Sequence, residues 1–247
     1  MAQYVLVPGA WLGGWAWRKV RTRLQAAGHD VTTPTLTGLG ERSHLARREV
    51  DLGTHIDDVV NAIVWDGLDE VVLVGHSLGG LVVAGVADRI PDRIRQVVYV
   101  GSSVPEDGRS LFDAAGRDYR AFVQARADEA GDGWRWPLPP PDELATYLPI
   151  DDMREEDRRW FWAHAVPQPL RTMDQPLSLT VATTALPVTW VQNELDGPLP
   201  DLPAAWTVRT LPTGHWPMVT MPDELADILR EAAEASAARY GLLAAVS

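Results

Sequence analysis

An apolar run that leads directly into a glycine-rich turn constrains the fold of this chain more than any other feature. Residues 71–74 are all Val or Leu, as expected of a strand in a parallel sheet whose two faces are covered by helices. Gly75-His76-Ser77-Leu78-Gly79-Gly80 follows at once, and the mostly apolar residues 81–87 predict a buried helix. Ser77 therefore lies on a tight turn between a strand and a helix.

This turn gives Ser77 the setting of a nucleophile. The residues beside the serine must be small in so tight a turn, and Gly75 and Gly79 lack the Cβ atoms that would clash. The first N–H groups and the positive dipole end of the next helix favour negative charge that develops nearby. We expect a catalytic Ser77 and a His76 that packs or hydrogen-bonds locally; the alternative is a structural turn in which the serine caps the helix.

The composition is typical of a globular protein, and the length is sufficient for one large α/β domain with an insertion. The chain has 247 residues, of which 46% are hydrophobic and 23% charged. The net charge of −12 argues against nucleic acid or an anionic membrane as a partner. Without cysteine, the chain has no disulfides and no thiolate chemistry, and we expect no metal site because no His, Asp or Glu set has ligand spacing.

The sequence also bears on location and partners. Residues 1–11 run into an expected strand without a basic n-region or a long apolar h-region, and no apolar stretch reaches the ~18 residues of a membrane span. We expect a cytoplasmic protein, and the abundance of Ala, Gly and Pro fits a GC-rich bacterial genome. A small-molecule substrate is the expected partner, and a homodimer is compatible with the sequence.

Strands and helices alternate through the first hundred residues. The expected strands are residues 4–7, 31–33, 71–74 and 97–100, with helical patterns between them. This alternation predicts an α/β fold with a doubly wound, mostly parallel sheet. Residues 104–185 instead read as helical and irregular, which predicts an inserted helical cap. Strands resume at 188–191 and 206–211, so the predicted core comprises residues 1–103 and 186–247.

A serine hydroxyl needs a base to take its proton and an acid that orients the base. His215 follows the last expected strand and is the predicted base, and Asp196 follows the strand before it and is the predicted acid. Both lie at carboxyl ends of strands, at the same edge of the sheet as Ser77. Glu194 and Glu106 remain alternatives to Asp196.

An oxyanion hole needs two backbone N–H groups that point at the tetrahedral oxygen. Leu78, directly after the nucleophile, is expected to supply one. The other is expected from the turn after the first strand, and we predict Ala10 as its donor. An ordinary glycine turn is the alternative for that segment.

With these motifs, the chain resembles α/β-hydrolases over essentially its whole length. It is most similar to the branch of plant methylesterases, hydroxynitrile lyases and bacterial small-ester hydrolases. The resemblance implies a core sheet with a helical cap, no cofactor, and a triad in the order Ser77, Asp196, His215. The stretches that carry it are residues 9–17, 35–42, 75–80, 104–108 and 214–215.

Three features of the sequence depart from the pattern of that branch. Pro8 replaces a histidine before Gly9, which affects the local geometry of the oxyanion hole. Only 19 positions separate Asp196 from His215. Pro198, Pro200 and Pro203 fall among them, so the helix usually found there is expected to be lost or shortened. The hydroxynitrile lyases carry a lysine after the catalytic histidine, and Trp216 at that position argues against cyanohydrin chemistry.

Several aromatic side chains are candidates for the substrate pocket. Trp11, Trp160, Trp162 and Trp216 lie in segments expected to face it, and His164 is a further candidate contact in the cap. The sequence therefore predicts a cofactor-independent serine esterase that acts on small to medium, largely apolar carboxylic esters through an acyl-enzyme. The alternatives are a non-hydrolytic cyclase, lyase or decarboxylase of bacterial secondary metabolism and a slow-turnover ligand receptor.

Overall fold

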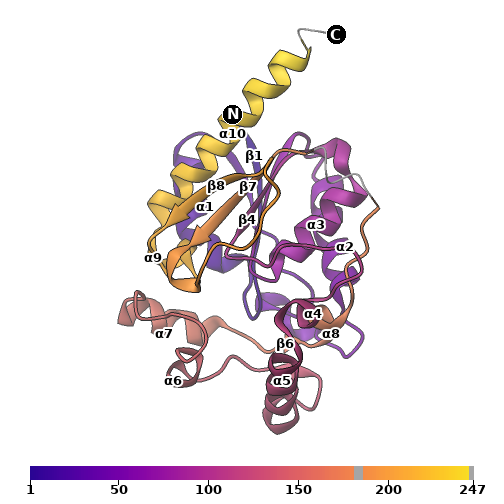
Figure 1. Ribbon diagram of the computed structural model, residues 1–247, viewed down its shortest axis with the longest axis vertical. Coiled ribbons are helices and arrows are strands. Elements are labelled where there is room, and N and C mark those ends of the chain that lie inside the picture. The colour runs from indigo at the N-terminus through magenta and orange to yellow at the C-terminus, as the bar shows by residue number, and fades with distance from the viewer. Residues whose placement is uncertain (181–185, 245–247) are drawn as a thin grey trace.

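A six-stranded parallel sheet forms the centre of the computed structural model (Figure 1). The structure describes residues 1–180 and 186–244, with residues 238–244 described by their backbone alone. The strand order is β2-β1-β3-β4-β7-β8. The strands are β1 Gln3–Val7, β2 Asp30–Thr32, β3 Val71–His76, β4 Ile94–Val100, β7 Val188–Asn193 and β8 Thr207–Leu211.

Helices cover both faces of this sheet (Figure 1). The helices α1 Arg18–Ala26 and α10 Pro222–Ala244 pack together on one face, and α2 Leu52–Trp65 and α3 Gly79–Arg89 pack on the other. Every residue of β3 and β4 is buried, which explains why the strand before Ser77 is apolar without alternation. The predicted α/β fold with a doubly wound parallel sheet is confirmed.

The strand order reverses beside β1. The chain passes from β1 to β2 on one side and then returns to β3 on the other side of β1. Such a switch point leaves a crevice at the carboxyl ends of the two strands, where ligands bind in open α/β sheets. Ala10 follows β1 and Ser77 follows β3, so both lie at this crevice.

An insertion, defined here as residues 104–180, separates β4 from β7 and lies beyond the sheet's carboxyl edge, at the bottom of Figure 1. Its strands β5 Arg135–Trp136 and β6 Gln168–Pro169 form a short antiparallel pair. The predicted end of the cap at residue 185 lies outside the described residues. The helices of the insertion are α4 Leu111–Ala115, α5 Arg117–Ala130, α6 Pro141–Leu144, α7 Glu155–His164 and α8 Arg171–Asp174.

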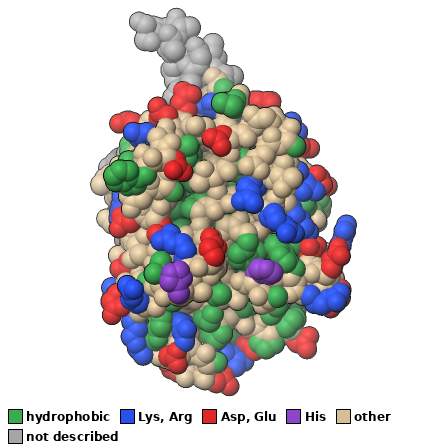
Figure 2. All heavy atoms as spheres, turned by 180° about the vertical axis from the view of Figure 1, so that it is seen from behind, with side chains coloured by type: hydrophobic (Ala, Val, Ile, Leu, Met, Phe, Trp, Pro, Cys, Tyr) green, Lys and Arg blue, Asp and Glu red, His purple; other side chains and the backbone are tan. Residues whose placement is uncertain are grey.

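The surface of the molecule carries charge of both signs. Acidic and basic side chains are interspersed on the face shown in Figure 2. Within residues 1–180 and 186–244, no helix is long and apolar enough to cross a membrane. The same residues contain no group of three or more His, Cys, Asp or Glu side chains arranged to hold a metal ion.

Candidate active site

The backbone at Ser77 adopts a conformation that L-residues rarely populate. Its φ is +51°, in the left-handed region, at the junction of β3 and α3. Two hydrogen bonds fix this conformation from the side of β4: the Ser77 N–H donates to the Val100 carbonyl at 3.0 Å, and the Ser102 hydroxyl donates to the Ser77 carbonyl at 2.9 Å. Strain held in this way is typical of functional sites.

The flanking glycines are required by close contacts. A Cβ atom on Gly75 would lie 2.5 Å from the Gly79 carbonyl oxygen, and one on Gly79 would lie 2.6 Å from the carbonyl oxygen of Pro8. A Cβ on Gly9 would lie 2.9 Å from the Cβ of Ser77. The turn after β1 therefore lies directly against the serine, where an oxyanion hole needs it.

The structure brings Ser77, His215 and Asp196 together. The Ser77 Oγ lies 3.1 Å from His215 Nε2, and His215 Nδ1 lies 2.9 Å from Asp196 Oδ2. The serine hydroxyl can donate to Nε2 while Nδ1–H donates to the carboxylate. The side chains of His215 and Asp196 are only 11% and 15% exposed, which strengthens their interaction.

Asp196 carries its negative charge in a partly buried position. Burial by itself raises the pKa of this carboxyl group, but hydrogen bonding and charge at His215 and a hydrogen bond from Asn193 outweigh it, so the pKa lies below its ordinary value. The Asn193 Nδ2 donates to Asp196 Oδ2 at 2.9 Å. The same oxygen therefore accepts from both partners, while Oδ1 is buried without a partner in the described part of the chain.

The two glutamates that were alternatives to Asp196 lie elsewhere. Glu106 is exposed and accepts hydrogen bonds from Arg109 at 3.0 Å through both carboxylate oxygens. Glu194 is exposed at the start of the short turn that ends in Asp196. Among the described contacts, neither glutamate forms a hydrogen bond or an ion pair with His215.

His76 is buried, and it hydrogen-bonds to a distant residue, whereas the sequence predicted packing or a local hydrogen bond. Its Nε2 lies 2.7 Å from the backbone carbonyl oxygen of His215. Complete burial, and secondarily the charge at His215, lower the pKa of His76 to about 3, so its ring is neutral at physiological pH. Nε2–H must then donate to this carbonyl, which holds the backbone of the loop that carries the predicted base.

Two backbone N–H groups border the serine without other partners. Ala10 and Leu78 line the same cavity as Ser77, and no hydrogen bond within the described residues uses their N–H groups. The neighbouring N–H of Trp11 is occupied, because it donates to Gln168 Oε1 at 3.0 Å. Within the described residues, the N–H groups of Ala10 and Leu78 thus remain available to a ligand in the cavity.

Ser77 and His215 open into a cavity of about 450 Å³. A cavity of this size suits a small to medium ligand. Its lining from the core includes Trp11, Ser102, Ser103, Trp190 and Gln192. Its lining from the insertion is mostly apolar and aromatic and comprises Leu111, Ala115, Tyr119, Trp136, Tyr147, Leu148 and Met173.

Comparison with known proteins identifies the family. Residues 4–228 match the model of the alpha/beta hydrolase family. The chain belongs to this family. It is 39% identical to a carbendazim hydrolyzing esterase of Nocardioides sp. (strain SG-4G), over 93% of this chain and 98% of that protein. It is also 39% identical to methylesterase 8 of Arabidopsis thaliana, over 43% of this chain and 40% of that protein.

A solved structure shares the fold over nearly the whole chain. An extracellular alpha/beta-hydrolase from a Paenibacillus species superposes with a TM-score of 0.82 and 24% sequence identity. The match covers 94% of this chain and 99% of that structure. The resemblance predicted from the motifs is thus confirmed for the family and for the fold.

The aromatic side chains of α7 do not line the cavity, contrary to the sequence prediction. Trp160 and His164 pack around Trp15, with ring centroids 4.8 and 5.3 Å away. Trp162 donates its indole N–H to the Pro139 carbonyl at 3.0 Å. This helix lies across the segment after β1, where Trp160, Phe161 and His164 pack against Trp15.

Trp216 is also absent from the cavity lining, because its side chain points toward Phe161 of α7. Its ring packs edge to face on Phe161 at 5.0 Å and is 2% exposed. Of the four predicted tryptophans, only Trp11 borders the cavity, where it packs 4.3 Å from Trp136. Trp11 lies in the turn after β1, at the edge of the sheet where the cavity opens, whereas the direction of the side chains of α7 could not be predicted from the sequence.

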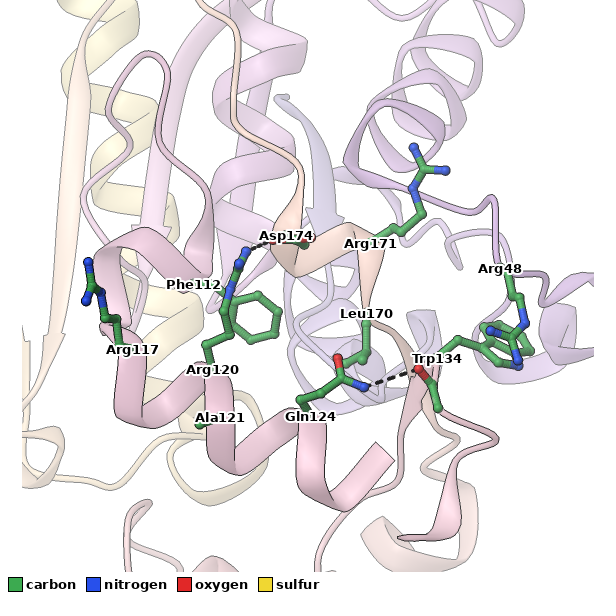
Figure 3. Close-up of a pocket in the computed structure, with 11 residues that line it drawn as sticks. Arg48, Phe112, Arg117, Arg120, Ala121, Gln124, Trp134, Leu170, Arg171 and Asp174 are labelled. Carbon is green, nitrogen blue, oxygen red and sulfur yellow. Dashed lines mark hydrogen bonds and ion pairs between the residues drawn. The ribbon is translucent and has the colours of Figure 1, made fainter. Parts of the chain in front are cut away.

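A second cavity of about 530 Å³ is lined mainly by residues of α4, α5 and α8 (Figure 3). Its described lining includes neither a serine nor a histidine, so it lacks the means to activate a nucleophile. Arg120 points toward its ion-pair partner Asp174, and Arg171 and Arg117 point away from each other (Figure 3). The arginines therefore do not converge on one ligand, and the cavity at Ser77 is the candidate active site.

Proposed function

We propose that the chain hydrolyses carboxylic esters through an acyl-enzyme on Ser77. The observation that carries this proposal is the continuous hydrogen-bonded series from Ser77 through His215 to Asp196, which opens into a cavity beside two free backbone N–H groups. The esterases among its relatives in the family support the reaction class.

In the first step, Ser77 Oγ attacks the ester carbonyl carbon while His215 Nε2 takes the hydroxyl proton. The carbonyl oxygen becomes an oxyanion and accepts hydrogen bonds from the N–H groups of Leu78 and Ala10. Asp196 stabilises the imidazolium that forms, because its carboxylate is ionised at neutral pH. His215 then donates its proton to the departing alkoxide, the bond to that oxygen breaks, and the alcohol leaves.

In the second step, water replaces the alcohol. The water oxygen attacks the acyl carbon while His215 Nε2 takes one proton from that water. The N–H groups of Leu78 and Ala10 stabilise the new oxyanion. Return of the proton to Ser77 Oγ breaks the acyl–enzyme bond and releases the carboxylic acid. Every proton in this cycle is carried by His215, so the chemistry requires no cofactor.

We propose that the insertion acts as a cap that selects small to medium, largely apolar esters. Its aromatic and aliphatic side chains form much of the wall of the 450 Å³ cavity. Carbendazim is the first compound to test, since a relative 39% identical over 93% of this chain is a carbendazim hydrolyzing esterase. Methyl esters of apolar acids are the second set, in view of the plant methylesterases.

The proposal is tested with a fluorophosphonate, which phosphonylates activated serines with loss of fluoride, followed by mass spectrometry of the labelled peptide. We expect the label on Ser77, and we expect Ser77→Ala to lower kcat on a small activated ester by on the order of 10⁴ to 10⁶. Ser43→Ala, at an exposed position outside the cavity, is the matched control and should retain full activity.

Wild-type turnover by a folded Ser77→Ala protein would overturn the covalent mechanism. Labelling of Ser77 without turnover of any ester would instead favour the non-hydrolytic alternatives or a receptor.

A further inference from the structure

A carboxylate from the insertion binds the loop that carries His215. Asp152 Oδ2 accepts a hydrogen bond from the Thr213 hydroxyl at 2.6 Å and another from the Gly214 backbone N–H at 2.7 Å. Thr213 is completely buried. Both bonds are charge-assisted and short, which makes them stronger than bonds between neutral groups.

The contact between the insertion and this loop is also close in space. A Cβ atom on Gly214 would lie 2.5 Å from the Pro149 carbonyl oxygen and 2.9 Å from Asp152 Oδ1. No side chain fits between the two segments, so Gly214 allows the backbone of the insertion to touch the residue just before the predicted base.

The opposite side of the loop is held by the core. His76 Nε2–H donates to the His215 carbonyl at 2.7 Å, and the Leu195 N–H donates to the Thr213 carbonyl at 3.2 Å. The N–H of Gly214 and the carbonyl of His215 are thus both fixed, one by Asp152 and the other by His76. Asp152 and His76 therefore hold the backbone immediately before and after the His215 side chain.

The segment that contains Asp152 also borders the substrate cavity. Tyr147 and Leu148 line the cavity a few residues before it. Beyond it, Asp157 forms an ion pair of 2.6 Å with Lys19, whose ammonium group also donates to the Val219 carbonyl at 3.1 Å. The insertion therefore contacts the core directly before His215, at Gly214, and again after it, through Lys19 at Val219.

We propose that Asp152 is a positioning residue that sets the distance between His215 and Ser77 and so makes the insertion part of the catalytic apparatus. The inference rests on the proposed function, because it assumes that His215 takes the proton of Ser77. It goes beyond that function by assigning a catalytic consequence to a residue of the insertion that does not touch the substrate.

The test measures the rate of fluorophosphonate labelling and the final labelled fraction for wild type, Asp152→Ala and Asp152→Asn. We expect Asp152→Ala to label 10- to 100-fold more slowly but to the same final fraction, because displacements of about 1 Å cost on the order of 10²-fold in rate. kcat on the smallest ester should fall to the same extent with little change in KM. Asp152→Asn should restore most of the rate, since its amide oxygen can accept both hydrogen bonds.

Asp151→Ala is the matched control. It also removes one carboxylate, at the residue next to Asp152, and the side chain of Asp151 is 97% exposed. It should behave as wild type. Should Asp152→Ala fail to fold, Thr213→Val removes one of the two bonds to the carboxylate, together with the hydrogen bond between the Thr213 and Thr220 hydroxyls, and should slow labelling several-fold.

The possible results separate the two proposals. If Asp152→Ala labels at the wild-type rate with a smaller final fraction, its role is only structural and the inference is overturned. An unaltered rate in Thr213→Val overturns it in the same way. Wild-type protein that fails to label at Ser77 would overturn the proposed function first, and the inference with it.

Discussion

At the scale of single residues, the position of the acid is the most informative point to test. Asp196→Asn should lower kcat on a small ester by on the order of 10⁴, because an amide neither fixes the tautomer of His215 nor stabilises its positive charge. Glu106→Gln and Glu194→Gln should change kcat little, since neither side chain contacts His215. Steady-state kinetics of the three variants checks this, and a larger loss in Glu106→Gln would mean that the acid is on the earlier strand.

The positions of Ser77 and His215 at the sheet edge could be predicted from the sequence. The residues that hydrogen-bond to Asp196 and to the loop of His215 could not. Ser77 and His215 stand at strand ends whose meeting follows from the parallel sheet alone. Asn193, which donates a hydrogen bond to Asp196, could have been noticed in the sequence, because it is a polar residue at the end of a buried strand. No sequence pattern pointed to Asp152, because its contact with Gly214 joins residues 62 positions apart and depends on how the insertion folds back onto the core.

At the scale of secondary-structure elements, the sequence located the strands and left the insertion poorly specified. Periodicity and apolar runs gave the strands to within a few residues, since β3 and β4 are buried on both faces. The insertion has short helices, from four residues in α6 to 14 in α5, and they are joined by irregular segments. Short elements carry little periodicity, so the sequence could not say which aromatic rings would face the cavity.

Ester-size preference should follow the segment that includes Leu148, which lines the cavity. Leu148→Ala should shift the preference toward longer acyl or alcohol chains, and Leu148→Phe should shift it toward shorter ones, each by roughly 10-fold in the ratio of kcat/KM values. A methylene group in an apolar pocket is worth this much discrimination. A chain-length series of esters measures the effect.

Trp160→Ala serves as the control for that series, because Trp160 packs on Trp15 outside the cavity. Its order of preference should match that of wild type. Parallel changes across the series in both Leu148 variants would show that this segment supports the fold without contacting the substrate.

At the scale of the whole molecule, two buried histidines link stability to pH. His76 and His55 are fully buried, and burial is the main cause that lowers the pKa of each ring, that of His76 to about 3. The backbone carbonyl of Thr37 accepts from His55 Nε2 at 3.0 Å in the neutral ring. An unfolded chain protonates both rings near pH ~6.5, whereas the folded chain takes up these two protons only at lower pH.

The free energy of unfolding should therefore fall as the pH drops below about 6.5, because the unfolded state binds protons that the native state excludes. Each such histidine contributes a slope of up to about 1.4 kcal/mol per pH unit. His55→Gln keeps a donor for Thr37 but removes one titrating group, so its loss of stability between about pH 6.5 and 5.5 should be shallower than that of wild type by up to this amount. Urea unfolding at a series of pH values measures both slopes. Because the carboxylates are common to both proteins, parallel curves would mean that His55 is protonated in the native state.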